Sequence, residues 1–253
     1  MISFFRELKQ RNPVLFYSGW ISFVGAIVCF VLMLINNTIV LGINAWIKPM
    51  KFFLSTTIFC WTIGWYIYYL QWKRKQLIYS WMVFIVLGFE LVVVTWQAAN
   101  GRLSHFNISS SFYLLLFNLM GVAITILTLW TAYIGYLFFR QKQFNIPRSY
   151  LWGIRLGIIY FVIFCFEGGL MAARLSHTVG AADGGEGLPL LNWSRGYGDL
   201  RIAHFFGMHS LQVLPLAGYF VFKTTRGIII FSLVYLALLV GLTVMALNAI
   251  PII

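Results

Sequence analysis

The sequence predicts an all-α fold, a polytopic membrane helix bundle with seven transmembrane helices. Of its 253 residues, 61% are hydrophobic and only 9% are charged, whereas about a quarter of the residues of a soluble domain are charged. The apolar residues form long runs of roughly 20, enough to cross the hydrocarbon core of a bilayer. The alternating pattern of membrane strands is missing. We therefore expect a single integral-membrane domain over residues 1–253, embedded in a lipid bilayer.

The seven apolar runs define the expected helices in order. The first, 14–35, follows a segment of mixed polarity without a small-residue cleavage site, so it should stay as an anchor. The next four runs are 51–72, 77–99, 111–139 and 150–174, and the fifth helix contains the pair Gly153 and Gly157, which favours close helix packing. The sixth, 200–222, follows the capping residue Asp199 and should kink at Pro215. The seventh is 228–250.

The Lys and Arg residues near the helix ends predict the orientation, because cytoplasmic loops carry an excess of them. One side holds Arg6, Lys9, Arg11, Lys73, Arg74, Lys75, Arg140, Lys142, Arg148, Lys223 and Arg226. The other side holds Lys48, Lys51, Arg102, Arg174, Arg195 and Arg201. The first side should be cytoplasmic, which places the N terminus inside and the C terminus outside. Arg155, within the fifth helix, is expected to extend its side chain to the cytoplasmic surface.

Two other classes of protein are excluded. The net charge of +12 comes with basic loops that orient helices and lack a nucleic-acid-binding motif, so no nucleic acid partner is expected. Cys29, Cys60 and Cys165 all fall inside apolar runs, which argues against a disulfide framework.

Ionisable residues gather in the outer half of the predicted bundle. On a rise of about 1.5 Å per residue, Glu90 and His209 lie about 13 Å below the outer boundary, and Glu167 and Asn118 about 10 Å below it. Such groups are costly in a membrane and mark functional sites. The alternative is that they hold helices together by hydrogen bonds between helices, as polar residues of membrane bundles do.

Polar residues also repeat at helical spacing, which predicts that stripes face a shared interior. The stripes are Glu90 with Gln97, Glu167 with Arg174, Ser111 with Asn118 and Thr125, and His209 with Gln212. His204 is five residues from His209, a rotation of about 140°. We therefore expect His209 to face the buried groups, and His204 to face the mouth near Arg201 or another helix.

These residue types suggest roles. Glu90, His209 and Glu167 are the candidate catalytic residues. The candidate substrate-binding residues are Arg102, Arg174, Arg201, Asn118, Gln97 and Gln212, since guanidinium groups bind phosphate or carboxylate in a bidentate manner. Imidazoles and carboxylates also bind zinc or iron, and the candidate ligands are His105, His177, His204, His209 and Glu90. The glycine-rich loop 175–199 is a candidate lid, and its segment Asp183-Gly-Gly-Glu186-Gly is expected to be a flexible turn.

Four segments carry a resemblance to a known group of proteins. They are WIKPMKF, NGRLSHFN, DGGEGLPLLNWS and GDLRIAHFFGMHSLQ. Together they resemble a group of bacterial polytopic membrane proteins to which no activity is assigned. The resemblance implies a multi-pass protein of the bacterial inner membrane whose motifs face the periplasm. The last helix lacks the lysine of microbial rhodopsins and the paired histidines of the ceramidase-related amidohydrolases.

The expected function is an integral-membrane enzyme with a His/Glu site open to the periplasm. Either a metal-bound water or a Glu–His acid–base pair would act on a lipid or small amphiphile. Two alternatives stay open: a haem- or quinone-linked redox protein, and a proton-coupled transporter or sensor. An oligomer, or a partner subunit that completes the site, is compatible with each of them.

Overall fold

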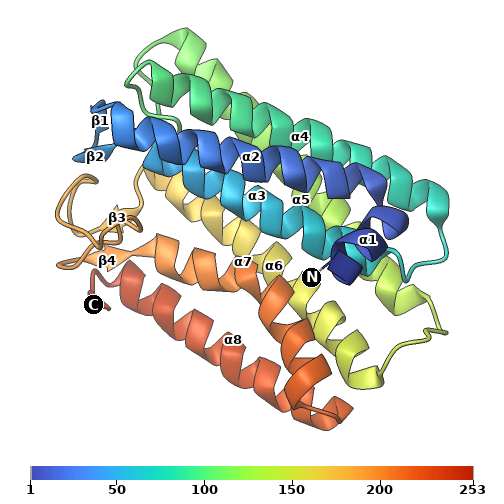
Figure 1. Cartoon of the computed structure of the whole chain (residues 1–253). Coiled ribbons are helices and arrows are strands. Elements are labelled where there is room, and N and C mark those ends of the chain that lie inside the picture. Colours follow the sequence, from blue (N-terminus) through green and yellow to red (C-terminus); the bar gives the residue numbers. More distant parts are fainter. Residues whose placement is uncertain (1, 253) are drawn as a thin grey trace. The chain divides into compact units, whose positions relative to one another are not determined.

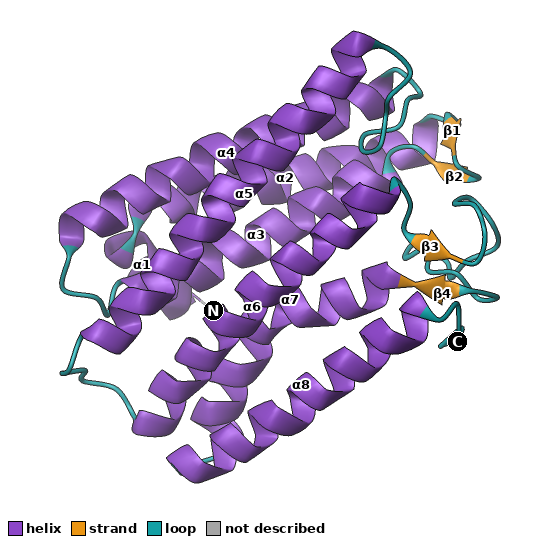
Figure 2. Ribbon diagram, turned by 180° about the vertical axis from the view of Figure 1, so that it is seen from behind, coloured by secondary structure: helices purple, strands orange, loops and turns teal. Residues whose placement is uncertain are grey.

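The computed structural model describes residues 2–252, and these are almost entirely helical (Figures 1 and 2). The α-helices are α1 (Ile2–Arg11), α2 (Pro13–Ile35), α3 (Ile47–Ile67), α4 (Lys73–Ala99), α5 (Ser111–Arg140), α6 (Arg148–Arg174), α7 (Leu200–Leu216) and α8 (Thr225–Leu247). A π-helix, η1 (Ala217–Val221), follows α7. Strands β1 (Ile39–Val40) and β2 (Ile43–Asn44) form one antiparallel pair, and β3 (Thr178–Val179) and β4 (Gly198–Asp199) form another. The all-α prediction is confirmed.

Five helices have the length and composition to cross a membrane: α2, α4, α5, α6 and α8. The expected second and sixth spans do not meet this criterion. α3 includes Lys48, Lys51 and several hydroxyl residues. α7 has 17 residues, since Pro215 lacks the N–H that would donate to the carbonyl of Leu211. The chain continues as η1 and changes direction there (Figure 1), so the kink predicted at Pro215 is confirmed.

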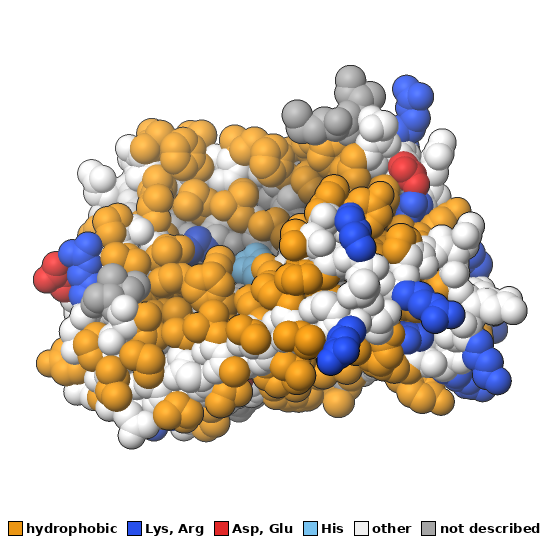
Figure 3. Space-filling view, turned by 90° about the horizontal axis from the view of Figure 1, so that it is seen from below, with side chains coloured by type: hydrophobic (Ala, Val, Ile, Leu, Met, Phe, Trp, Pro, Cys, Tyr) orange, Lys and Arg blue, Asp and Glu red, His pale blue; other side chains and the backbone are white. Residues whose placement is uncertain are grey.

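Large apolar side chains lie on the outside of these helices. Ile21 on α2, Leu115 on α5 and Val234 on α8 are each more than half exposed. Figure 3 shows hydrophobic side chains covering most of one face. Monomeric soluble proteins rarely expose apolar patches of this size. The exposed apolar side chains and the five long helices therefore support a multi-pass helical membrane protein.

The chain divides into two compact units, Met1–Leu127 and Thr128–Ile253, with α5 continuing from the first into the second. In the first unit α2 packs along α3, and both contact α4. In the second unit α6 and α7 form the most extensive helix pair, and α8 packs against both. Phe164, Ala203 and Leu239 form a buried cluster among these three helices. The expectation of a single domain stays a prediction.

Glycines allow α6 and α7 to approach closely. A Cβ on Gly153 would lie 2.5 Å from the carbonyl oxygen of Leu214, and one on Gly157 would lie 2.9 Å from that of Ser210. The Ser210 hydroxyl donates a hydrogen bond of 3.1 Å to the carbonyl of Gly157. Gly207 of α7 is covered in turn by the Phe164 ring. The close packing predicted from Gly153 and Gly157 is confirmed.

Arg155 is held by contacts within the second unit. Its Nε and Nη2 atoms donate hydrogen bonds of 3.1 and 2.8 Å to the carbonyl oxygen of Phe138 near the end of α5. The guanidinium also lies 4.9 Å from the ring centroid of Phe139 and 5.2 Å from that of Trp152. A main-chain carbonyl and aromatic rings thus hold the charge within the second unit. The expected extension of the side chain to the cytoplasmic surface stays a prediction.

The glycine contacts predict a strong effect of one methyl group. Gly153→Ala should lower the free energy of unfolding by about 1–3 kcal/mol, because the added carbon meets backbone that cannot move aside. Gly169→Ala, on the same helix, is the matched control, since a Cβ there would meet no packed neighbour within 4 Å among the described residues. Thermal unfolding of the detergent-solubilised variants measures the difference. Equal stability of the two variants would contradict close packing at Gly153.

Candidate functional site

The predicted site residues fall in both units, so they are described unit by unit. Glu90, Gln97, Arg102, His105 and Asn118 belong to the first unit. Glu167, Arg174, His177, Arg201, His204, His209 and Gln212 belong to the second. The expected pairing of Glu90 with His209 joins residues of different units and stays a prediction.

In the first unit, α4 carries a buried polar stripe. The side chains of Glu90 and Gln97 are only 3% and 2% exposed, respectively. Within the described part of the chain, Oε1 of Glu90 and Oε1 of Gln97 have no hydrogen-bond partner. Leaving a buried polar group unpaired costs about 1–3 kcal/mol. The burial predicted from their seven-residue spacing is confirmed, and the unpaired oxygens make this stripe a candidate for proton chemistry.

The stripe expected on α5 is not in the interior. Asn118 is exposed, as are Ser111 and Thr125. The helix instead buries Met120, which packs with Val93 and Val94 of α4. Residues two positions apart on an α-helix differ by about 200° of rotation. Because Met120 is buried, Asn118 faces outward.

Two loop residues of the first unit have local partners. The exposed Arg102 donates a hydrogen bond to the Tyr113 hydroxyl, and its guanidinium lies 4.8 Å from the centroid of that ring. The His105 ring packs against Phe52, with 5.3 Å between the ring centroids. Its Nδ1 lies 3.3 Å from the Ser104 hydroxyl. The arginine proposed for substrate binding thus has an aromatic partner next to the start of α5.

In the second unit, Glu167 of α6 and His204 of α7 form a pair. His204 Nδ1 lies 3.2 Å from Glu167 Oε2 and 2.7 Å from the carbonyl oxygen of Phe164. The side chain of Glu167 is 7% exposed, and that of His204 is 23% exposed. The sequence left open whether His204 faces the mouth or another helix, and it faces α6. The Glu167–His204 pair itself was not predicted, because the spacing within each helix does not say which residues meet across two helices.

The surroundings of this pair define its chemistry. The short distance to Phe164 directs the Nδ1 hydrogen to that carbonyl, which leaves Nε2 as the basic nitrogen of a neutral ring. Both carboxyl oxygens of Glu167 are buried, and among the described residues neither accepts a hydrogen bond. Gly168 makes room, because a Cβ there would lie 2.8 Å from His204 Cε1. A fixed imidazole beside a buried carboxyl group can accept, hold and release a proton.

His209 has different neighbours. Its Nδ1 lies 3.2 Å from Oε1 of Gln212, and its ring centroid lies 4.4 Å from that of Phe205. The contact with Gln212 confirms the shared face predicted from their spacing. His209 is half-buried, whereas α7 buries Gly207, Ser210 and Leu211. The expected orientation of His209 toward the buried groups of other helices stays a prediction.

The loop 175–199 is organised by Asp183. This carboxylate accepts hydrogen bonds from the Ser176 hydroxyl at 3.0 Å, the Thr178 backbone N–H at 2.9 Å and the His177 ring Nδ1 at 2.8 Å, besides the His177 backbone N–H. Burial alone would raise the pKa of Asp183, but the hydrogen bonds and the charge of His177 hold this pKa well below its ordinary value. Asp183 is therefore an anchor of the loop, and the flexibility expected of the segment that it begins stays a prediction.

Asp199 is the second anchor of this loop. Its side chain is almost fully buried and accepts hydrogen bonds from the backbone N–H of Arg201 at 3.0 Å and of Ser194 at 2.8 Å. It thus caps α7 as predicted. Arg201 is ion-paired with Asp199 and also donates to the carbonyl of Asn192, so this candidate substrate-binding residue already has structural partners. Arg174, at the end of α6, is exposed.

The structure does not establish a metal centre. Within residues 2–252, no group of three His, Cys, Asp or Glu side chains is placed to hold a metal ion. The expected ligands His105, His177, His204, His209 and Glu90 come from both units. The zinc or iron site therefore stays a prediction.

The anchoring role of Asp183 predicts a pH-dependent effect. At pH 7, Asp183→Asn should lower the free energy of loop opening by about 1–3 kcal/mol, because hydrogen bonds to a charged acceptor are lost. The folded pKa lies below the ordinary value of about 3.9, so the stabilisation is complete above that value and is lost as the pH falls through the folded pKa. Hydrogen exchange at His177 and Thr178 measures loop opening, and thermal unfolding down to about pH 3 follows the pH dependence.

Glu186→Gln is the control for this experiment. The Glu186 side chain is 84% exposed, and its ion pair with Arg195 spans 3.5 Å at the surface. Exposed pairs contribute about 0–1 kcal/mol, so this variant should behave like the wild type. A loop that opens equally in both variants would show that Asp183 does not anchor it.

Comparisons with known proteins assign no family to this chain. Searches against protein-family models, curated proteins and solved structures found no match. The resemblance of the four sequence segments to bacterial inner-membrane proteins therefore stays a prediction. The geometry of the two units is the basis for the functional argument.

Proposed function

We propose that the chain is an integral-membrane enzyme with an acid–base site in the outer half of the bundle, acting on a lipid or small amphiphile at the periplasmic side of a bacterial inner membrane. The proposal includes seven spans, with the N terminus inside and the C terminus outside. The observation that carries it is the Glu167–His204 pair, in which a carboxyl oxygen lies 3.2 Å from the imidazole Nδ1. A buried ionisable pair within membrane helices is a functional site by default.

His204 is the proposed general base. The Phe164 carbonyl fixes the Nδ1 hydrogen, so Nε2 can accept a proton from a substrate hydroxyl or from water. The ring then carries a positive charge, and the nearby Glu167 carboxylate stabilises it. The proton returns from Nε2 to the leaving group. Glu167 thus acts on the reaction through His204.

The other candidate residues extend this site in the proposal. His209 and Gln212 supply a second polar face on α7, and Glu90 supplies a second buried carboxyl group from the first unit. The loop 175–199, held by Asp183 and Asp199, is proposed to cover the outer end of the second unit. Zinc or iron bound by a histidine set is the metal-dependent form of the same proposal.

Proton-coupled transport is the second candidate function. One observation favours it: Glu90 and Glu167 are both buried carboxyl groups, and within residues 2–252 at least one oxygen of each lacks a hydrogen-bond partner. Carboxyl groups of this kind form proton relays in membrane transporters. The two candidates differ in whether a covalent product appears.

The test uses purified protein in vesicles of phosphatidylethanolamine and phosphatidylglycerol, with lipid products measured by mass spectrometry. Wild type should convert a lipid, and His204→Gln and Glu167→Gln should each lower the rate by about 10²–10⁴-fold, the usual contribution of general acid–base catalysis. Glu186→Gln makes the same chemical change at an exposed position and should retain the wild-type rate.

Two further measurements separate the alternatives. Proton flux into the vesicles that is lost in Glu90→Gln and Glu167→Gln, without any lipid product, would replace the enzyme proposal by transport. Unfolding of both His204→Gln and Glu167→Gln in thermal scans would assign the pair to helix packing instead. Metal analysis of wild type beside His209→Ala and His204→Gln tests the metal-dependent form.

A further inference from the structure

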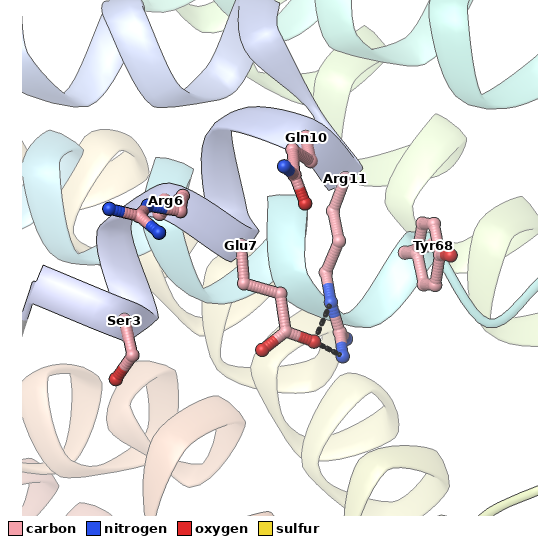
Figure 4. Close-up of a pocket in the computed structure, with 6 residues that line it drawn as sticks. All are labelled: Ser3, Arg6, Glu7, Gln10, Arg11 and Tyr68. Carbon is pink, nitrogen blue, oxygen red and sulfur yellow. Dashed lines mark hydrogen bonds and ion pairs between the residues drawn. The ribbon is translucent and has the colours of Figure 1, made fainter.

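A polar cavity lies in the first unit, far along the sequence from the residues proposed for catalysis. It has a volume of about 380 Å³ and lies between α1 and Tyr68, the residue that follows α3. Its walls are Ser3, Arg6, Glu7, Gln10, Arg11 and Tyr68 (Figure 4). Positions 3, 6, 7 and 10 share one face of a helix, so the polar face of α1 forms most of the lining.

The apolar face of α1 is taken up by the protein itself. Phe4 stacks on Trp65 at 4.9 Å, and Phe5 contacts Trp61 at 4.9 Å between ring centroids. Leu8 is fully buried. An amphipathic helix lying free at a membrane surface would insert such residues into lipid. Here they hold α1 against α3, so the cavity has a fixed wall.

The charges in the cavity are partly compensated. Glu7 forms an ion pair with Arg11, and the Arg11 guanidinium is held over the Trp65 ring at 3.7 Å and the Tyr68 ring at 4.7 Å. Figure 4 shows the Glu7 carboxylate turned toward Arg11, with the Arg6 guanidinium pointing away from that pair. Arg6 makes no ion pair with any described residue. The lining therefore keeps one positive charge in excess.

The rim of the cavity is basic as well. Lys73, at the start of α4, donates a hydrogen bond of 3.4 Å to the carbonyl of Tyr68, and its ammonium lies 4.5 Å from the centroid of that ring. Arg74 and Lys75 follow directly in the sequence. Clusters of Lys and Arg beside membrane helices attract anionic lipid head groups. Lys73 thus adds a positive charge beside Tyr68, a residue of the cavity wall.

We propose that this cavity binds the phosphate ester group of a phospholipid head group. A phosphodiester carries a single negative charge, which matches the single excess positive charge of the lining. Arg6 supplies a guanidinium that can bind phosphate oxygens in a bidentate manner. The Ser3 hydroxyl and the Gln10 amide supply further donors on the same face of α1. The proposal is independent of the acid–base site, because the two sites share no residue.

The test compares Arg6→Gln with Lys9→Gln in the full-length, detergent-purified protein. Both substitutions remove one positive charge from α1, but only Arg6 lines the cavity. Binding of dioctanoyl phosphatidylglycerol is followed by native mass spectrometry. Wild type should bind one lipid molecule, Arg6→Gln should weaken binding by about tenfold or more, because a charge-assisted bidentate contact is lost, and Lys9→Gln should stay within about twofold of wild type.

A competition with glycerol 3-phosphate identifies the source of the phosphate. Retention of the lipid in an excess of glycerol 3-phosphate supports a lipid head group, whereas displacement supports a soluble phosphate ester in the same cavity. Equal weakening by the two substitutions, or the absence of lipid binding to wild type, overturns the proposal. Arg6 is exposed, so Arg6→Gln should fold normally, and its thermal unfolding is measured to verify this.

Discussion

The close approach of α6 and α7 is the constraint on which the second unit depends. At Gly153 and Gly157 the two backbones are so close that even a methyl group would meet a carbonyl oxygen. Further along the same interface, Gly168 lets the His204 ring reach the carbonyl of Phe164 and the carboxyl group of Glu167. Wider helix separation would leave the imidazole without either partner. Helix packing therefore creates the pair on which the proposed chemistry rests.

Four of the six acidic residues of the chain fall into two kinds. Asp183 and Asp199 lie in or beside a loop and are fully engaged by backbone N–H groups and cationic side chains. Glu90 and Glu167 lie within helices, and each has a buried oxygen that no described residue hydrogen-bonds. Satisfied carboxylates stabilise the fold, whereas unsatisfied ones are retained at a cost in stability. This contrast separates the two acids that stabilise the loop from the two acids that are proposed to act in the site.

Local patterns were the part of the fold that could be predicted. The long apolar runs, the cap at Asp199, the kink at Pro215 and the buried face of Glu90 and Gln97 all follow from spacing or from the chemistry of single residues. α1 was missed, because its ten residues mix apolar, polar and charged types and form no apolar run. The direction that Asn118 faces depends on which side of α5 packs against α4. The sequence of α5 alone does not show which side that is.

Contacts between helices are the features that the sequence did not predict. The Glu167–His204 pair requires α6 and α7 to be neighbours in a particular register, and no motif within either helix encodes that register. The same holds for Arg155, which finds a carbonyl on α5 seventeen residues away. The sequence of α6 alone does not show this contact.

The position of Asp199 has a mechanical consequence. This residue caps the first turn of α7, pairs with Thr178 in the β3–β4 ladder and holds the backbone of Ser194. His204 follows five residues later on the same rigid helix. Loop and imidazole are thus linked through one carboxylate and little more than one turn of helix. A displacement of the loop at Asp199 would therefore shift the first turn of α7 and, with it, the His204 ring.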